Sequence, residues 1–309
     1  MIAAGDRVIL SGKGKTYVVR AGEGSLGTDL GMVDLSQLTG KEPGDLITTR
    51  SGKELIIRLP RATDFFEQAK RSGAPMLPRD IGLVIGLTGM NKNDHVLDAG
   101  TGSGVAAVFF AGVAGKVTTC ERREEFFRLA MENIKETGLS NIEVLNKDVL
   151  EVNGTYDIVH LDLGITRDHV VHAFSLVRPG GYLVCYTPFF EQMGVVVDTA
   201  SGLFSEVTAH ESIMREMDRS DRGTRPSTKV CHSRYLTVAR KYGKEKLKVF
   251  WGKIVVIYNR CTVTGCPDNK KSALLCMSND VLFRVDKGHC SIDLFIMKFR
   301  KPFSHMTQF

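Results

Sequence analysis

Short apolar segments alternate with helical segments between residues 94 and 187, and this alternation constrains the fold most strongly. The apolar segments lack a polar residue at every second position, which is typical of parallel strands covered on both faces. The pattern predicts strands over residues 96–97, 117–120, 142–145, 156–161 and 182–186. The segments between them are predicted to be helices, among them an amphipathic helix over residues 124–137 that ends at Gly138. The fold class is therefore α/β, with a doubly wound, mostly parallel, Rossmann-like sheet.

Four of the predicted strands are followed by a carboxylate. These residues are Asp98, Glu121, Asp148 and Asp162. Open parallel sheets bind ligands outside the carboxyl ends of their strands, so the four side chains are expected at one edge of the sheet. Each of them alone could equally cap a helix or lie in a loop. Four acids in register with the strands favour a binding site.

A glycine-rich turn follows the first acid and reads Asp98-Ala-Gly100-Thr-Gly102-Ser103-Gly104. Glycine lets the backbone turn tightly and approach a ligand closely. The dinucleotide fingerprint places its third glycine where this chain has Val105, which disfavours a nicotinamide dehydrogenase. Glu121 suits a ribose diol, because a carboxylate accepts from both hydroxyls, and Asp148 suits an adenine amino group.

Composition and charge divide the chain into three parts. Residues 1–60 have short apolar runs broken by Gly, Asp and Ser and predict a small β domain. Residues 61–241 contain the Rossmann-like pattern. Residues 242–309 hold 12 Lys and Arg against 5 Asp and Glu, whereas the rest of the chain holds 29 against 30. The net charge of +6 therefore belongs to the C-terminal extension, and bulk charge does not predict that the body binds nucleic acid.

Several other classes of protein are disfavoured. A chain with 43% hydrophobic and 25% charged residues is typical of a globular protein, and no segment approaches the roughly 18 apolar residues of a membrane span. The first residues lack the pattern of a signal peptide, so the seven cysteines are expected to be reduced thiols of a cytoplasmic protein. No metal is expected, because the histidines and the extension's cysteines lack the spacing of zinc ligands. Those cysteines are Cys261, Cys266, Cys276 and Cys290.

Several segments resemble one family, the archaeal and bacterial tRNA adenine-N1 methyltransferases of the TrmI type. The glycine turn has the acid-x-Gly-x-Gly-x-Gly spacing of motif I of all class I S-adenosylmethionine-dependent methyltransferases. The segment His232-Ser-Arg-Tyr-Leu-Thr-Val-Ala-Arg240 is much more specific. The remaining matching segments are Gly5–Val8, Thr28–Gly31, Pro78–Asp80, His160–Leu163, Val184–Pro188 and Arg225–Pro226.

The resemblance implies an enzyme that transfers a methyl group from S-adenosylmethionine to N1 of a T-loop adenine in tRNA. Position 58 is the implied target, with position 57 as a further candidate. The resemblance also implies a homotetramer and an N-terminal β domain that helps to grip tRNA. In this chain Gly164 stands where the family's motif after the fourth strand has proline, Asp98 stands where relatives often have glutamate, and Gly27 replaces a common histidine.

The candidate site residues follow from the turn, the acids and the resemblance. The expected cofactor-binding residues are Asp98, Gly100, Gly102, Ser103, Gly104, Glu121, Asp148 and Asp162. Asp162 is the catalytic candidate, because a carboxylate that accepts from the adenine N6 amine orients the base and stabilises its developing charge. The target base must be everted into the site, and the candidates to contact the substrate are Tyr186, Pro188, Arg225 and His232.

Alternative functions share part of this pattern. A methyltransferase that acts on protein carboxylates, of the isoaspartyl type, or on a small molecule would have the same fold and glycine turn. It would not need the N-terminal β domain or the segment from His232 to Arg240. A non-catalytic tRNA-binding subunit is expected to have lost the glycine turn and the acids, which are intact here.

Overall fold

The computed structural model of the chain describes residues 1–71, 73–229, 232–243, 248–250 and 253–255. The chain divides into two compact units, residues 1–244 and 245–309. In the second unit, strand β16 (Lys248–Phe250) pairs antiparallel with β17 (Lys253–Val255). The four cysteines of the extension lie outside the described residues.

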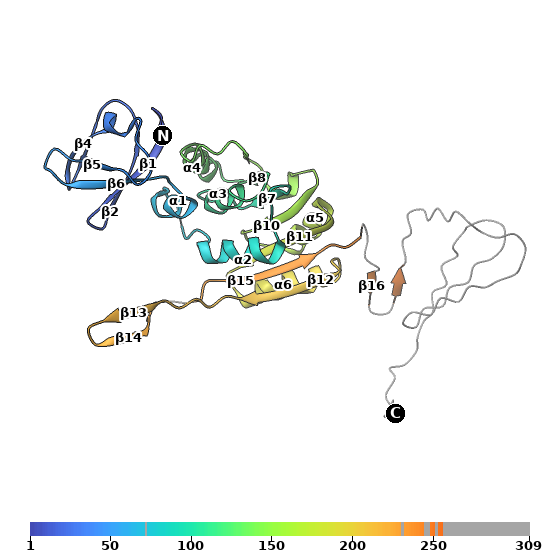
Figure 1. Ribbon diagram of the computed structural model, residues 1–309. Helices are drawn as coiled ribbons and strands as arrows, with labels where there is room; N and C mark the ends of the chain where they lie inside the picture. The colour runs from blue at the N-terminus through green and yellow to red at the C-terminus, as the bar shows by residue number, and fades with distance from the viewer. Residues whose placement is uncertain (72, 230–231, 244–247, 251–252, 256–309) are drawn as a thin grey trace, which may run out of the picture. The chain divides into compact units, whose positions relative to one another are not determined.

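The first 60 residues form antiparallel sheets with a core of their own (blue in Figure 1). One sheet has the order β2-β1-β6-β5. A hairpin and a 3-10 helix follow β2 in the chain, and Val8, Leu10, Leu38 and Ile57 are buried beneath these elements. The bounds are β1 (Arg7–Gly12), β2 (Lys15–Arg20), β3 (Ser25–Thr28), β4 (Gly31–Asp34), η1 (Leu35–Leu38), β5 (Leu46–Thr48) and β6 (Glu54–Arg58).

The remainder of the first unit is built on a seven-stranded sheet of order β12-β15-β11-β10-β7-β8-β9. The strands β11, β10, β7, β8 and β9 are parallel and confirm the predicted Rossmann-like arrangement. Crossing from β7 to β10 brings residues 62 positions apart into register, with His160 beside Asp98. These strands are β7 (His95–Ala99), β8 (Lys116–Cys120), β9 (Ile142–Leu145), β10 (Tyr156–Leu161) and β11 (Val177–Thr187).

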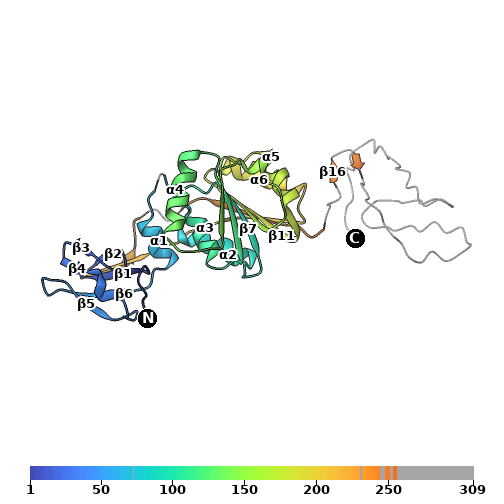
Figure 2. The ribbon, with the colours of Figure 1, turned by 90° about the horizontal axis from the view of Figure 1, so that it is seen from above.

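Helices cover both faces of this sheet, as Figure 2 shows. Neighbouring strand residues point to opposite faces, so Val96 and Ile158 belong to one buried cluster, whereas Leu97 and Val159 belong to the other. The first cluster includes residues of α1 (Ala62–Gln68), α2 (Pro78–Thr88), α3 (Val105–Ala111) and α4 (Glu124–Lys135). The second includes residues of α5 (Arg167–Leu176) and α6 (Phe190–Ser201). Burial on both faces explains why the strand segments are apolar without alternation.

The structure adds strands that the alternating pattern does not predict. Strand β15 (Tyr235–Arg240) pairs antiparallel with β11, and β12 (Glu206–Glu211) pairs antiparallel with β15. Between them in the chain, β13 (Met217–Ser220) and β14 (Gly223–Pro226) form an exposed hairpin. The predicted end of the helix at Gly138 is wrong by a few residues, because α4 ends at Lys135 with Glu136 as its C-cap.

Candidate functional site

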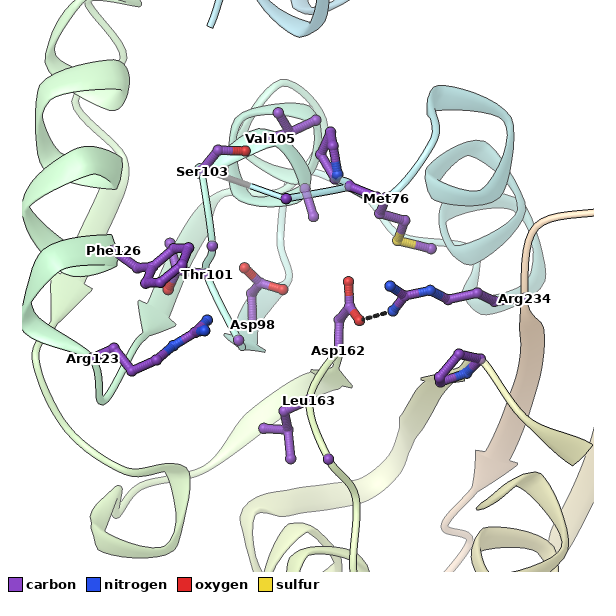
Figure 3. A pocket seen from close by; sticks show the side chains of 18 of the residues that line it. Met76, Asp98, Thr101, Ser103, Val105, Arg123, Phe126, Asp162, Leu163 and Arg234 are labelled. Carbon is purple, nitrogen blue, oxygen red and sulfur yellow. Dashed lines mark hydrogen bonds and ion pairs between the residues drawn. The ribbon is translucent and has the colours of Figure 1, made fainter. Parts of the chain in front are cut away.

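A cavity of about 300 Å³ lies at the carboxyl ends of β7 and β10. Figure 3 shows Asp98 and Asp162 next to each other in this cavity, with Arg123 and Arg234 reaching toward them from opposite sides. The residues that line it are Gly73, Ala74, Pro75, Met76, Asp98, Gly100, Thr101, Gly102, Ser103, Val105, Ala106, Arg123, Phe126, Asp162, Leu163, Gly164, Pro188, Gln192 and Arg234.

The glycine turn needs glycine for a steric reason that the structure makes explicit. Gly100 has a φ of +92°, and a Cβ at this position would lie 2.1 Å from the backbone oxygen of Asp162. Gly104 has a φ of +84°, and its Cβ would lie 3.1 Å from Cγ1 of Ile134 in α4. Because L side chains rarely adopt such φ values, the turn can pass between β10 and α4 only with glycine at these positions.

Asp98 is held at the floor of the cavity by two partners and is 1% exposed. The hydroxyl of Thr119 donates to Oδ2 at 2.8 Å, and Nδ1 of His160 lies 2.7 Å from Oδ1. His160 is itself fully buried, with the ring of Phe110 packed edge-on against it. Because both carboxylate oxygens are engaged, the position of Asp98 is fixed relative to β8 and β10.

Glu121 directly follows β8, and its carboxylate lies against the glycine turn. It accepts hydrogen bonds from the backbone N–H of Gly102 at 3.3 Å and of Arg123 at 3.1 Å, and from Nε of Arg123 at 3.0 Å. Burial favours the neutral acid, but the bonds from Arg123 and Gly102 outweigh it and lower the pKa of Glu121 below its ordinary value. The Arg123 guanidinium also lies 3.7 Å from the centre of the Phe126 ring, and both residues line the cavity.

Asp162 directly follows β10 and forms an ion pair inside the cavity. Nη1 of Arg234, a residue just before β15, donates to Oδ1 of Asp162 at 2.6 Å (Figure 3). Burial raises the pKa of Asp162 above its ordinary value, although Arg234 and His160 act in the opposite direction. The site therefore contains a carboxylate that is desolvated and partly compensated by a single arginine contact.

Tyr186 lies behind this ion pair and does not line the cavity. Its hydroxyl donates to Oδ2 of the buried Asp80 in α2 at 2.6 Å, and burial together with this bond raises the pKa of the phenol. The Arg234 guanidinium lies 5.1 Å from the centre of the Tyr186 ring, within the range of a cation–π contact. Tyr186 therefore contacts Arg234, which lines the cavity, but does not line the cavity itself.

The structure brings part of the predicted set together. Six of the predicted residues line the cavity, namely Asp98, Gly100, Gly102, Ser103, Asp162 and Pro188. Glu121 and Gly104 lie directly next to this lining through Gly102 and the turn. Asp148 instead caps the 3-10 helix η2 (Val149–Glu151), where it accepts from the Leu150 N–H at 3.0 Å.

The two remaining predicted substrate residues lie outside the cavity lining. Arg225 is exposed on strand β14 of the hairpin. Nδ1 of His232 lies 2.8 Å from Oε1 of Glu211, and its ring packs against that of Tyr235. Gly164, which departs from the family's proline, lines the cavity, but a Cβ there would meet open space and its φ is not left-handed. The loop after β10 therefore does not require glycine at this position.

Residues that the sequence does not single out complete the site. Arg123, Phe126, Met76, Gln192 and Arg234 all line the cavity. Arg234 lies inside the specific segment at the C-terminal end of the resemblance, and Arg123 lies two positions after a predicted acid. Their positions in the sequence could have indicated that both arginines belong to the site. The pairing of Arg234 with Asp162, however, depends on the antiparallel strand β15.

Among the residues that the structure describes, no helix is both long and apolar enough to cross a membrane. They also contain no group of three or more His, Cys, Asp or Glu side chains that could hold a metal ion.

A Rossmann-like sheet with this glycine turn and strand-end carboxylates defines the class I S-adenosylmethionine-dependent methyltransferases. A family model described as the tRNA methyltransferase complex GCD14 subunit matches residues 75–225. The protein named tRNA (adenine(57)-N(1)/adenine(58)-N(1))-methyltransferase TrmI from Methanocaldococcus jannaschii is 30% identical over 268 residues, which cover 76% of this chain and 94% of the relative. The chain therefore belongs to the TrmI family of tRNA (adenine-N1)-methyltransferases.

Solved structures agree with this fold. An S-adenosylmethionine-dependent O-methyltransferase from Thermotoga maritima superposes with a TM-score of 0.69 at 27% identity and covers 79% of this chain and 96% of its own. The tRNA (m1A58) methyltransferase TrmI from Aquifex aeolicus gives a TM-score of 0.64 at 22% identity, with coverage of 78% and 99%. Both likenesses extend well beyond the glycine turn, and both include most of the first unit's length.

Proposed function

We propose that this protein transfers a methyl group from S-adenosylmethionine to N1 of an adenine in the T-loop of tRNA, at position 58 and with position 57 as a further candidate. The observation that carries the proposal is the Asp162 carboxylate, which lies in the same cavity as the glycine turn. A donor bound at the turn and a base bound at Asp162 would therefore be neighbours. Family membership supports the identity of the base.

The residues at the glycine turn fit S-adenosylmethionine. Gly100 leaves the turn without a side chain at the point of closest approach to Asp162, where a Cβ would collide with the backbone. The charged Glu121 lies beside the turn and can accept hydrogen bonds from ribose hydroxyls. When bound, S-adenosylmethionine supplies an activated methyl group on a sulfonium. Asp98 and Ser103 line the same cavity and are further residues that would hold the donor. Asp148 is proposed to accept from the adenine amine with Oδ2, because Oδ1 accepts from the Leu150 N–H.

The acceptor side depends on what a carboxylate can do for adenine. N1 of adenine has its lone pair in the ring plane, and positive charge builds on the ring as the N1–CH3 bond forms. Asp162 can accept a hydrogen bond from the N6 amine, which fixes the orientation of the ring and stabilises this charge. Pro188 and Met76 also line the cavity and give it apolar surface beside Asp162.

The proposed reaction is tested by incubating the full chain with methyl-labelled S-adenosylmethionine and an unmodified tRNA transcript. We expect label in the tRNA, located by mass spectrometry of nuclease fragments as 1-methyladenosine at position 58. A transcript with uridine at position 58 is the control, and label that persists in it would identify position 57. Label that appears in an isoaspartyl peptide or a small-molecule extract, with none in tRNA, would contradict the proposal.

The proposed role of Glu121 gives a separate prediction on donor binding. The Glu121→Gln variant loses the charged acceptor, and charge-assisted hydrogen bonds contribute about 1.5–3 kcal/mol. We therefore expect its Kd for S-adenosylmethionine, measured by calorimetry, to rise roughly 10- to 100-fold. Glu143→Gln is the matched control, because Glu143 is half-exposed in β9 and pairs with Lys116. An unchanged Kd in the Glu121 variant would exclude this role.

We further propose a homotetramer that works in the cytoplasm and whose N-terminal β domain helps to grip tRNA. These features come from the family resemblance. Large apolar side chains that are exposed in the single chain support an assembly that covers them. They are Phe189, Phe190, Ile213, Met214 and Met217. Light scattering of the full chain in solution measures the mass directly, and a monomer would contradict the tetramer.

A further inference from the structure

Arg234 occupies a position at which it controls the geometry of Asp162. Nη1 of Arg234 donates a hydrogen bond to Oδ1 of Asp162 at 2.6 Å. Figure 3 draws a single contact, from Arg234 to one oxygen of Asp162, and the second oxygen lies in the cavity with no hydrogen bond drawn to it. The carboxylate is therefore presented with one oxygen occupied and the other in the cavity where a base would bind.

Arg234 is itself held from behind by residues of other elements. Its guanidinium lies over the Tyr186 ring at the end of β11. Tyr186 is anchored in turn by its hydrogen bond to Asp80, 106 residues away in the sequence and 2% exposed. A side chain stacked on a fixed ring loses little further freedom when it forms a bond, so the Arg234–Asp162 contact is preorganised.

We propose that Arg234 is a positioning residue for methyl transfer, which holds one oxygen of Asp162 and thereby presents the other, negatively charged, to the amine of the acceptor base. This inference rests on the proposed function. Arg234 does not contact the reacting atoms in this arrangement and acts through Asp162.

The charges around Asp162 predict the sign of the effect. Asp98 faces it from β7 and raises its pKa, whereas His160 from its own strand and Arg234 lower its pKa. Arg123 lines the opposite side of the cavity. Burial raises the pKa of Asp162, and the positive charge of Arg234 opposes this effect. Removal of Arg234 therefore raises the pKa of Asp162. Protonated Asp162 donates where it should accept, so methyl transfer is then lost at a higher pH than in the wild type.

The first test does not depend on activity. In full-length protein labelled with 13C at aspartate carboxyl carbons, the Asp162 signal is assigned by its absence from Asp162→Asn. Its titration is then followed in the wild type, Arg234→Met and Arg234→Lys. We expect the titration midpoint to move upward in Arg234→Met and to lie closer to the wild type in Arg234→Lys, which keeps the charge but not the planar fork.

The second test uses single-turnover methylation of tRNA as a function of pH. We expect Arg234→Met to lower the rate by up to about 100-fold, as misplacement of a catalytic group does, and to shift the acid limb of the profile upward. The affinity for S-adenosylmethionine should remain within a few-fold of the wild type. In Arg234→Lys, the acid limb of the pH profile should lie close to that of the wild type, whereas the rate should recover less.

The matched control is Arg178→Met. Arg178 makes the same type of contact, Nη1 to Oδ1 at 2.6 Å, with Asp157 at the opposite end of β10. This variant should leave both the Asp162 titration and the pH profile unchanged. An Asp162 midpoint that does not move in Arg234→Met, or that moves equally in Arg178→Met, would overturn the inference.

Two outcomes separate this inference from the proposed function. If the wild type does not methylate tRNA, the proposed function fails, while the titration still decides whether Arg234 holds Asp162. If the titration moves but the acid limb does not, Arg234 is an electrostatic neighbour of Asp162 and the positioning role is wrong. If Arg234→Met does not fold, the titration of Asp162 and the pH profile are compared between the wild type, Arg234→Lys and Arg178→Met.

Discussion

Replacement of Asp162 by alanine is expected to lower the kcat of tRNA methylation by about 10²- to 10⁴-fold, the usual contribution of a positioned acid or base. The substitution removes the acceptor for the adenine amine and leaves the Arg234 guanidinium, normally 2.6 Å from Asp162, without this partner. An unpaired positive charge then faces a base that itself becomes cationic. Both effects raise the barrier of the chemical step and leave the glycine turn intact.

The measurement that isolates this effect is single-turnover methylation combined with calorimetry of donor binding. The Kd for S-adenosylmethionine should change by no more than a few-fold, because Glu121 and the turn remain. Asp198→Ala, which removes an exposed carboxylate from α6, is the control and should retain wild-type turnover. Near-normal turnover in Asp162→Ala would refute the catalytic assignment.

Replacement of Gly100 by alanine is expected to be the most damaging single change to the site that adds one methyl group. The new Cβ would lie 2.1 Å from the Asp162 backbone oxygen in a residue with a φ of +92°. A non-glycine residue in such a region costs about 1–3 kcal/mol, and overpacking adds a similar amount. Relief of the clash requires the turn and the loop after β10 to separate, which displaces Asp98 and Asp162 from each other.

We therefore expect Gly100→Ala to lower the free energy of unfolding by about 2–6 kcal/mol and to abolish detectable binding of S-adenosylmethionine. Chemical denaturation and calorimetry measure the two quantities. Gly82→Ala is the matched control, because Gly82 lies within α2, has no left-handed φ and has open space at its Cβ. This change should stabilise the protein by about 0.5–1 kcal/mol. A Gly100 variant that is as stable as the wild type and binds the donor would contradict the close approach of the turn.

The sheet and one side of the site could be predicted from the sequence because their determinants are local. A strand buried on both faces needs a continuous apolar run, and a turn with positive φ needs glycine. The residues after each strand then lie at one edge of the sheet. Asp98, Asp162 and the glycines from Gly100 to Gly102 were placed correctly on this basis.

The sequence does not determine which hydrogen-bond partners such side chains have in the folded chain. Asp148 follows a strand as predicted, but its side chain caps η2 and lies outside the cavity lining. Tyr186 lies near the end of β11, and its hydroxyl donates a hydrogen bond to Asp80 in α2. Hydrogen-bonding side chains select partners by geometry that the chain order does not contain.

The sequence alone therefore determined the Rossmann-like sheet, the glycine turn and the edge at which the acids gather, because these depend on neighbours a few residues apart. The tertiary structure decided which acids face one cavity and which arginines oppose them. Strand β15 brings Arg234 to Asp162 across 72 residues of sequence. Long-range pairing between strands sets this contact, and it arises only when the chain is packed.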